Sequence, residues 1–289
     1  MLRKLPAHLT QFTLFFACLL MIVPEGRLLA GGLAVSPQRL SFEGRTRTAE
    51  VLLRTNGSET QTYRLSLVEM DMPEEGALKM VDKPAPDRMS ARKLIRFSPR
   101  QVVLRPGETQ VIRVRVRKPG GLKDGEYRSH LLFQNVPETN NDIERQIENK
   151  PTFGTEVRIV PIYGVAIPVT VRHGELSAEA SLSELKLINT SGKPADSQTL
   201  SMILGRSGNR SVHGDLRVLH QQPGGSTVEV GRLNGVSVYT PGKRRRANVN
   251  LAVPAGRKLS AGTLTVEYRT KAKYGGELLA SSSMTLGRQ

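Results

Sequence analysis

The sequence predicts an all-β protein with two immunoglobulin-like β-sandwich domains that follow a cleaved signal peptide. Two observations lead to this fold class. First, short segments such as Val111–Val116 mix apolar and polar residues with a period near two, and almost nothing follows the helical period. Second, 27 glycines and 17 prolines interrupt these segments at the short intervals that are typical of β-sandwiches.

The N-terminal residues have the features of a secretion signal. Arg3 and Lys4 form a basic start, and Phe12–Val23 is an apolar stretch too short to cross a bilayer. Small residues follow, so we expect cleavage after Ala30 or Ala34 and assign residues 1–30 to the signal peptide. The alternative is an uncleaved N-terminal anchor.

Composition limits the function of the mature chain. Cys18, inside the apolar stretch, is the only cysteine, so we expect a mature protein that is stabilised by its core and not by disulfides. No later segment reaches the length of a membrane span, so we expect no membrane insertion after signal cleavage. The net charge of +16 would suit nucleic acid, an anionic surface or acidic proteins. A secretion signal argues against intracellular nucleic acid, and the basic run Lys243–Arg246 is interpreted as a solvated loop.

The first domain is predicted at residues 32–172. Its turns and alternating runs indicate about seven strands, which is the immunoglobulin-like number. The long segments Asp71–Ala91 and Pro137–Pro151 are polar or proline-rich and are predicted as loops. The predicted strands are Ala34–Phe42, Ala49–Thr55, Thr62–Met70, Ile95–Leu104, Gln110–Lys118, Glu126–Asn135 and Thr155–Val171.

The last of these strands is unusually long and apolar. It contains Pro161 and Pro168, and proline, which has no N–H to donate, is found mainly at sheet edges. A long apolar edge is an aggregation hazard unless it pairs with another chain. The periodicity leaves two alternatives open: the strand pairs with a partner, or it crosses the core and becomes the interdomain linker.

The second domain is predicted at residues 173–289 as another β-sandwich. Short apolar runs alternate with turns such as Gly205–Asn209 and Gln222–Ser226. The predicted strands are Glu184–Asn189, Thr199–Leu204, Gly214–Leu219, Val228–Leu233, Val236–Tyr239, Ala247–Val253, Gly262–Arg269 and Leu278–Leu286.

The sequence carries no recognisable catalytic or metal-binding motif, so we predict that the protein is not an enzyme and needs no cofactor or metal. It contains no H-E-x-x-H, G-x-S-x-G, Walker loop, G-x-G-x-x-G or C-x-x-C pattern. The histidines of the mature chain are scattered without the spacing of metal ligands. They are His130, His173, His213 and His220.

Three segments in order resemble the periplasmic chaperones of chaperone–usher pilus assembly, the PapD-like family. Val35–Phe42 (V-S-P-Q-R-L-S-F) resembles the first strand of the family. Ile95–Arg117 resembles its F-x-x-x-P-x-x-x-x-L-x-P-G pattern with the strand that follows, and Glu126–Pro137 resembles its strand with an Asn-x-Ile/Val-Pro end. The shared pattern covers about 140 residues behind the signal peptide, as in a divergent branch of the family.

This resemblance implies donor-strand complementation. Pilus subunits of this kind are immunoglobulin-like folds without their final strand, and the chaperone lends the last strand of its first domain to fill the gap. The groove would receive one of two alternating sets of side chains from this strand. We favour the set Val157, Ile159, Pro161 and Tyr163 over the opposite set Val160 and Ile162, because Glu156 and Arg158 alternate with Val157 and Ile159.

The resemblance also implies a basic pair that holds the C-terminal carboxylate of the subunit between the two domains. The arginine of the first strand corresponds to Arg39. The lysine of the last strand has no counterpart, because its place falls at Tyr163, and Arg158 or Arg172 are the candidates to replace it. A terminal carboxylate needs such charge-assisted donors where water is partly excluded.

The implied function is that of a periplasmic chaperone that stabilises fimbrial subunits and delivers them for surface-fibre assembly. Its partners would be those subunits and an outer-membrane usher, and two copies could cap each other's apolar strand in a dimer. The alternative is a secreted structural or adhesive β-sandwich protein that lends no strand. An accessible last strand would favour the chaperone, and a covered one would favour the structural protein.

Overall fold

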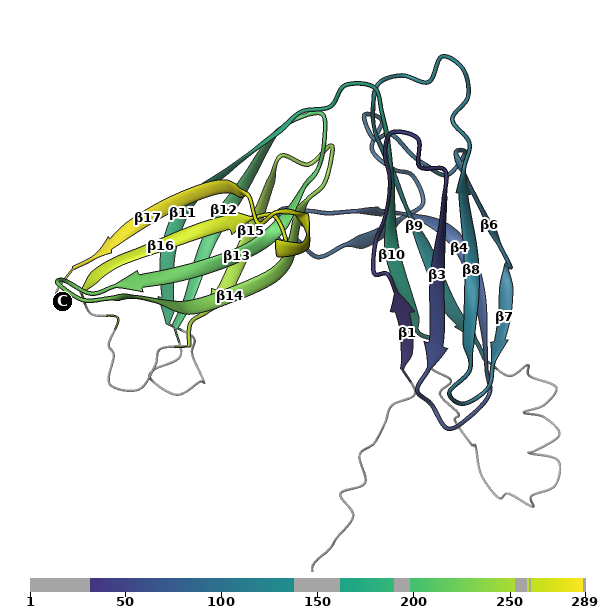
Figure 1. The fold of residues 1–289 in the computed structure, drawn as a ribbon, viewed down its shortest axis with the longest axis horizontal. Coiled ribbons are helices and arrows are strands. Elements are labelled where there is room, and N and C mark those ends of the chain that lie inside the picture. The colour runs from purple at the N-terminus through teal and green to yellow at the C-terminus, as the bar shows by residue number, and fades with distance from the viewer. Residues whose placement is uncertain (1–31, 138–161, 190–197, 253–258, 260, 288–289) are drawn as a thin grey trace, which may run out of the picture.

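The protein consists of two β-sandwiches set at an angle to each other (Figure 1). The structure is a computed structural model, and it describes residues 32–137, 162–189, 198–252, 259 and 261–287. Within these ranges the only helical element is the 3-10 turn η1 (Ala272–Tyr274), and no helix is long and apolar enough to span a membrane. The predicted fold class, all-β with two immunoglobulin-like sandwiches, is confirmed, whereas the signal peptide lies outside the described residues.

The first sandwich is made of two mainly antiparallel sheets. One sheet has the order β1-β3-β8-β6. Its strands are β1 (Leu33–Ser36), β3 (Thr48–Thr55), β8 (Thr109–Val116) and β6 (Ile95–Ser98). The other sheet has the order β2-β10-β9-β4-β5, and β7 also pairs with β4. Its strands are β2 (Leu40–Phe42), β10 (Gly164–His173), β9 (Gly125–Val136), β4 (Gln61–Asp71), β5 (Lys79–Val81) and β7 (Gln101–Leu104).

Alternating side chains from both sheets form the core of this sandwich. Val51 and Leu53 of β3, Ile112 and Val114 of β8, and Phe133 of β9 are fully buried. A shift of register by one residue would turn each of these sets toward solvent, so the alternation fixes how the strands pair.

Two of the predicted strands are each divided between the sheets, and here the prediction of single strands was wrong. Ala34–Phe42 forms β1 in one sheet and β2 in the other, and Ile95–Leu104 forms β6 and β7 in the same way. Pro37 and Pro99 stand at the two crossing points. Because proline has no N–H for the ladder, the chain leaves the first sheet there.

The second sandwich also contains two sheets, with orders β11-β12-β15 and β14-β13-β16-β17. Buried residues from Leu200 to Leu286 form its core, separate from the core that extends from Val35 to Val171. We keep 32–172 and 173–289 as the proposed domain limits. The strands are β11 (Ala178–Asn189), β12 (Gln198–Gly208), β13 (Val212–Gln221), β14 (Thr227–Val238), β15 (Arg244–Asn250), β16 (Gly262–Arg269) and β17 (Leu278–Leu286).

Three local predictions for this sandwich were wrong. Gly205–Asn209 is mostly the end of β12 and not a turn, and Val228–Tyr239 is nearly all one strand, β14, and not two. The basic run is also not a loop, since Arg244–Arg246 opens β15. Carboxylates offset its charge, because Arg244 lies 2.7 Å from Glu184 and Arg246 lies 3.2 Å from Glu74.

Glu74 belongs to the β4–β5 connection, which reaches from the first sandwich to the second (Figure 1). The amide of Arg246 donates to the carbonyl of Glu74 at 2.6 Å. Gly76 approaches Arg245 so closely that a Cβ would lie 2.4 Å from its Nε. The predicted loop Asp71–Ala91 therefore contributes a docked arm, which also contains β5.

Candidate functional site

The last strand of the first sandwich, β10, has an open edge along half of its length. β9 pairs with β10 from Gly164 to His173, whereas β2 pairs in parallel only with Val169–Val171. Among the described residues, Gly164–Pro168 therefore have a neighbouring strand on one side only.

The backbone groups on this open edge can be assigned from the ladder. The amide of Asn135 donates to the carbonyl of Tyr163 at 3.0 Å, so Tyr163 bonds toward β9. Hydrogen bonds alternate along an antiparallel pair, so the N–H and C=O groups of Gly164 and Ala166 face the open side. Pro168 occupies the next outward position, where its missing N–H leaves no bond to β9 unmade.

Two large apolar side chains are exposed at the start of this edge. Ile162 is 59% exposed and Tyr163 is 40% exposed. By alternation Tyr163 shares its face with Val165 and Ile167, which pack in the core. Of the predicted groove-filling residues only Tyr163 is described, since Val157, Ile159 and Pro161 lie outside the described residues, as do Arg158 and Val160.

The open edge ends at a cationic cleft between the two sandwiches. Glu126, Arg128 and His130 alternate along β9 on the face that points away from the core, and all three are buried. The second sandwich buries them, since Tyr239 contacts both Arg128 and His130. This cleft joins residues that are far apart in the sequence.

Arg39 lies at the rim of this cleft, directly before β2. It donates to the hydroxyl of Ser237 at 3.0 Å and to that of Tyr239 at 2.8 Å. Leu40 is in register with Val169, so Arg39 is level with Pro168, where the open edge ends. The predicted anchor residue is thus located between the domains, in contact with the second one.

Arg128 is the cation that sequence analysis missed. Its guanidinium carbon lies 4.1 Å from the ring centre of Tyr239, and one amino group donates to the carbonyl of Thr240 at 3.2 Å. Its Nε and Nη1 have no hydrogen-bond partner among the described residues, although the side chain is almost fully buried. Burial, reinforced by Arg88, lowers its pKa to about 10. Alternation along Glu126–His130 was the available signal, but it did not show that a second domain covers this face.

Two histidines border the same cleft and are held neutral. Burial and the charges of Arg128, Arg88 and Arg39 lower the pKa of His130 to about 3. Burial and the charges of Arg39 and Lys271 lower the pKa of His213 to about 3. The lowered pKa values of both histidines therefore reflect a buried region with an excess of positive charge.

Arg172, a predicted replacement for the missing lysine, has other partners. Its guanidinium lies 3.1 Å from Glu126 and 3.0 Å from Glu43. Glu126 in turn accepts hydrogen bonds from the amide and hydroxyl of Ser211 in the second sandwich. Arg172 therefore takes part in a polar contact between the two domains, and it does not lie beside Arg39.

Among the described residues, no group of three or more His, Cys, Asp or Glu side chains is arranged to hold a metal ion. The features that this site presents are the backbone groups along the open edge and the guanidinium groups of Arg39 and Arg128.

Comparison with known proteins finds similarity to solved structures. No family model matches the chain, and the search of curated proteins finds no match. Seven of the similar solved structures are fimbrial chaperones, each covering about nine-tenths of the chain. One is the chaperone–tip adhesin complex of CFA/I fimbriae, with 12% identity and a TM-score of 0.43, over 89% of this chain and 100% of the other.

Two further examples are similar in extent. The CsuC–CsuE chaperone–tip adhesion subunit complex of Acinetobacter baumannii has 11% identity and a TM-score of 0.42, over 89% of this chain and 99% of the other. The CupB2 chaperone of Pseudomonas aeruginosa has 12% identity and a TM-score of 0.41, over 88% and 100%.

Proposed function

We propose that this protein is a non-enzymatic periplasmic chaperone that binds and stabilises fimbrial or pilus subunits by donor-strand complementation. The observation that carries the proposal is the open edge of β10 at Gly164–Pro168, with exposed Ile162 and Tyr163 at its start. An extended segment of a subunit would add to this edge through backbone hydrogen bonds.

The position of β2 supports a specific direction for the bound strand. β2 occupies the edge from Val169 onward, so a strand that pairs with Gly164–Pro168 must stop level with Arg39. A subunit strand that ends there, running parallel to β10, would place its C-terminal carboxylate at Arg39. We assign Arg128 as the second cation of this anchor, because its Nε and Nη1 have no partner among the described residues.

The groove-filling residues are proposed as Val157, Ile159, Pro161 and Tyr163. The face that Tyr163 shares with Val165 and Ile167 supports this choice over the opposite set. A subunit sheet that pairs with the open edge would continue this sheet, so its own core would lie on the same face.

The alternative function, a finished structural or adhesive domain, would need a covered edge. The backbone groups of Gly164 and Ala166, which no described strand pairs on the open side, favour the chaperone, because an edge strand left unpaired is a liability in a protein that has no use for it. The proposal includes an outer-membrane usher as the recipient of loaded chaperone, and it includes no nucleic acid, cofactor or membrane insertion. Before loading, a dimer in which two copies cap this edge would protect it.

The test is co-purification of small secreted subunits from the periplasm of the source cells. We expect the unchanged protein to capture them and the variant Val157→Asp with Ile159→Asp to lose at least nine-tenths of the capture, because a buried charge is costly in an apolar groove (about 3 kcal/mol or more). Val103→Asp is the control, since Val103 is 55% exposed on β7, away from the edge. Equal capture by all three proteins would contradict strand donation.

A further inference from the structure

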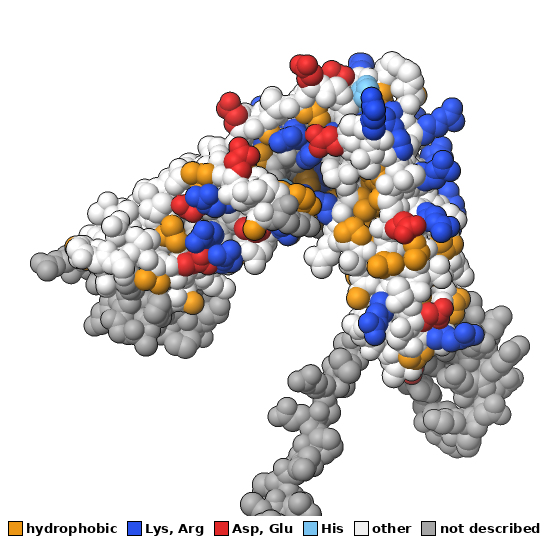
Figure 2. Space-filling model, viewed as in Figure 1, with side chains coloured by type: hydrophobic (Ala, Val, Ile, Leu, Met, Phe, Trp, Pro, Cys, Tyr) orange, Lys and Arg blue, Asp and Glu red, His pale blue; other side chains and the backbone are white. Residues whose placement is uncertain are grey.

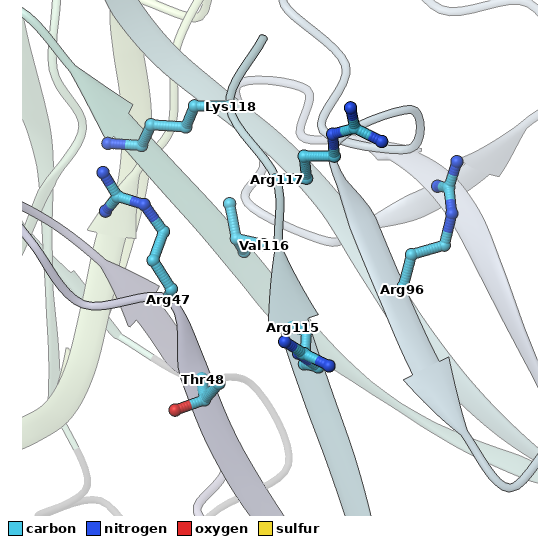
Figure 3. A pocket seen from close by; sticks show the side chains of 7 residues that line it. All are labelled: Arg47, Thr48, Arg96, Arg115, Val116, Arg117 and Lys118. Carbon is cyan, nitrogen blue, oxygen red and sulfur yellow. The ribbon is translucent and has the colours of Figure 1, made fainter.

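A second cationic site lies in the first sandwich, on the sheet that does not contain β10. A pocket of about 480 Å³ opens where β8 and β6 approach the start of β3. Figure 2 shows Lys and Arg side chains gathered along this side of the first sandwich. Five cations line the pocket, as Figure 3 shows: Arg47, Arg96, Arg115, Arg117 and Lys118.

The strand register brings like charges together in this pocket. Arg96 of β6 and Arg115 of β8 are direct cross-strand partners, and both are exposed on the outer face of the sheet. On its other side, Arg115 pairs with Thr48 of β3, so neither cross-strand neighbour of Arg115 is a carboxylate. Like charges in such a pair destabilise a sheet, so the arrangement has a cost to the unliganded fold.

Several outward-facing arginines elsewhere on the described sheets have an acidic partner. Arg113, two residues before Arg115 and on the same face, lies 3.4 Å from Glu50. Arg217 and Arg232 share Glu229, and Arg269 lies 2.8 Å from Glu267. Within the described residues the side chains of Arg115 and Arg117 have no such ion pair. The pocket therefore gathers five cations, none of which forms an ion pair with a described carboxylate.

Several of the pocket cations are held in place by backbone acceptors. Arg47 donates to the carbonyls of Gly44 and Thr46, and Arg96 donates to those of Lys93 and Ile95, at 2.7–3.2 Å. Lys118 donates to the carbonyl of Arg172, and burial together with the charge of Arg47 lowers its pKa. Among the described residues, Glu43 is the carboxylate whose charge acts on Lys118, and Glu43 forms an ion pair with Arg172. Positioned cations of this kind lose little freedom when a ligand binds.

We propose that this pocket binds a multiply charged phosphate group, carried by a soluble polyphosphate compound or by a lipid headgroup. Four planar guanidinium groups match the oxygen geometry of phosphate and can each bind it through two hydrogen bonds. Five cations call for several negative charges in a small volume, and a concave pocket suits a compact group better than an extended acidic peptide. This site shares no lining residue with the strand-donating edge or with the interdomain cleft.

The test uses tripolyphosphate as the probe in isothermal titration at low salt with the purified protein. We expect saturable binding to one site, weakened at least tenfold by the double substitution Arg96→Gln with Arg115→Gln and less than twofold by Arg113→Gln. The double variant should keep its melting temperature or raise it, because removing the two arginines relieves repulsion. Such a result separates a lost site from a damaged fold.

Three results would overturn the proposal: no saturable binding, equal weakening in the Arg113→Gln control, or tighter binding of hexaglutamate than of tripolyphosphate at the same residues. Flotation with vesicles that contain phosphatidylglycerol then identifies the source of the phosphate. Binding to vesicles that depends on Arg96 and Arg115 supports a lipid headgroup, and tripolyphosphate binding without vesicle binding supports a soluble phosphate.

Discussion

Buried residues in the interdomain cleft lie close to several positive charges. His130 is fully buried, neither of its ring nitrogens has a hydrogen-bond partner among the described residues, and Arg39, Arg88 and Arg128 act on it. Glu69 forms an ion pair with Arg88 at 3.2 Å and accepts hydrogen bonds from Ser90 and Ser129. Arg128, in contrast, forms no ion pair among the described residues, and it contacts the ring of Tyr239 and the carbonyl of Thr240.

The depressed pKa of His130 predicts a pH dependence of stability. The folded protein keeps His130 neutral down to about pH 3, whereas the unfolded chain takes up a proton near its ordinary pKa of about 6.5. The free energy of unfolding should therefore fall as the pH drops from about 6.5 toward 3, by up to about 1.4 kcal/mol per pH unit for this one group. His130→Leu should flatten the curve measured by urea unfolding at pH 5 and pH 7, and identical slopes would contradict this account.

Replacing Arg128 separates binding from stability. Arg128→Met removes a buried charge whose Nε and Nη1 lack partners, so the melting temperature should stay the same or rise, while subunit capture should fall at least tenfold. Arg206→Met is the matched control, because buried Arg206 donates to backbone carbonyls that include those of Gly208 and Gly242. That variant should lose about 1–3 kcal/mol of stability, since those carbonyls would lose their donor. Full capture by Arg128→Met would rule out its role as an anchor.

Among the structural elements, β10 combines a core strand with an open edge. Val169–Val171 are paired on both sides, whereas among the described residues Gly164–Pro168 are paired on one side only. β9 approaches β10 closely at Gly164, near the start of the strand. A Cβ at Gly164 would lie 2.9 Å from the carbonyl oxygen of Phe133 and 3.1 Å from Leu132.

Gly164→Ala should therefore push the start of β10 away from β9. We expect a loss of about 1–3 kcal/mol in the free energy of unfolding. Amide exchange at Asn135, which donates to the carbonyl of Tyr163, should become faster, as measured by hydrogen–deuterium exchange. Gly120→Ala is the control, because nothing lies within 4 Å of a Cβ at Gly120. Unchanged exchange at Asn135 would contradict the assigned contact.

At the scale of the whole molecule, the cleft depends on contacts between the two sandwiches. The guanidinium carbons of Arg39 and Arg128 lie 5.7 Å and 4.1 Å from the ring centre of Tyr239. His130 meets the same ring edge to face. Glu126 with Ser211, and Glu74 with Arg246, add polar ties around it. The angle between the sandwiches is therefore coupled to the same residues that would bind a subunit carboxylate.

Tyr239→Ala should weaken this coupling. Removing a buried ring costs about 3 kcal/mol and also removes the cation–π contacts of both arginines. We expect a larger radius of gyration in small-angle X-ray scattering. Tyr239→Phe, which keeps the ring and loses only the hydroxyl that accepts from Arg39, should stay close to the unchanged protein. Equal scattering from all three proteins would mean that other contacts set the angle.

The sequence by itself determined the all-β class and most strands of the first sandwich, because period-two alternation and turn residues are local signals. It did not show that Pro37 and Pro99 move the chain from one sheet to the other, since this depends on which strands pair. Only the tertiary structure decided that Arg128 and Arg39 both contact Tyr239 and that Arg172 pairs with Glu126. Side chains on the outer face of β9 acquire their partners from a second domain more than 80 residues away along the chain, and no local pattern encodes that contact.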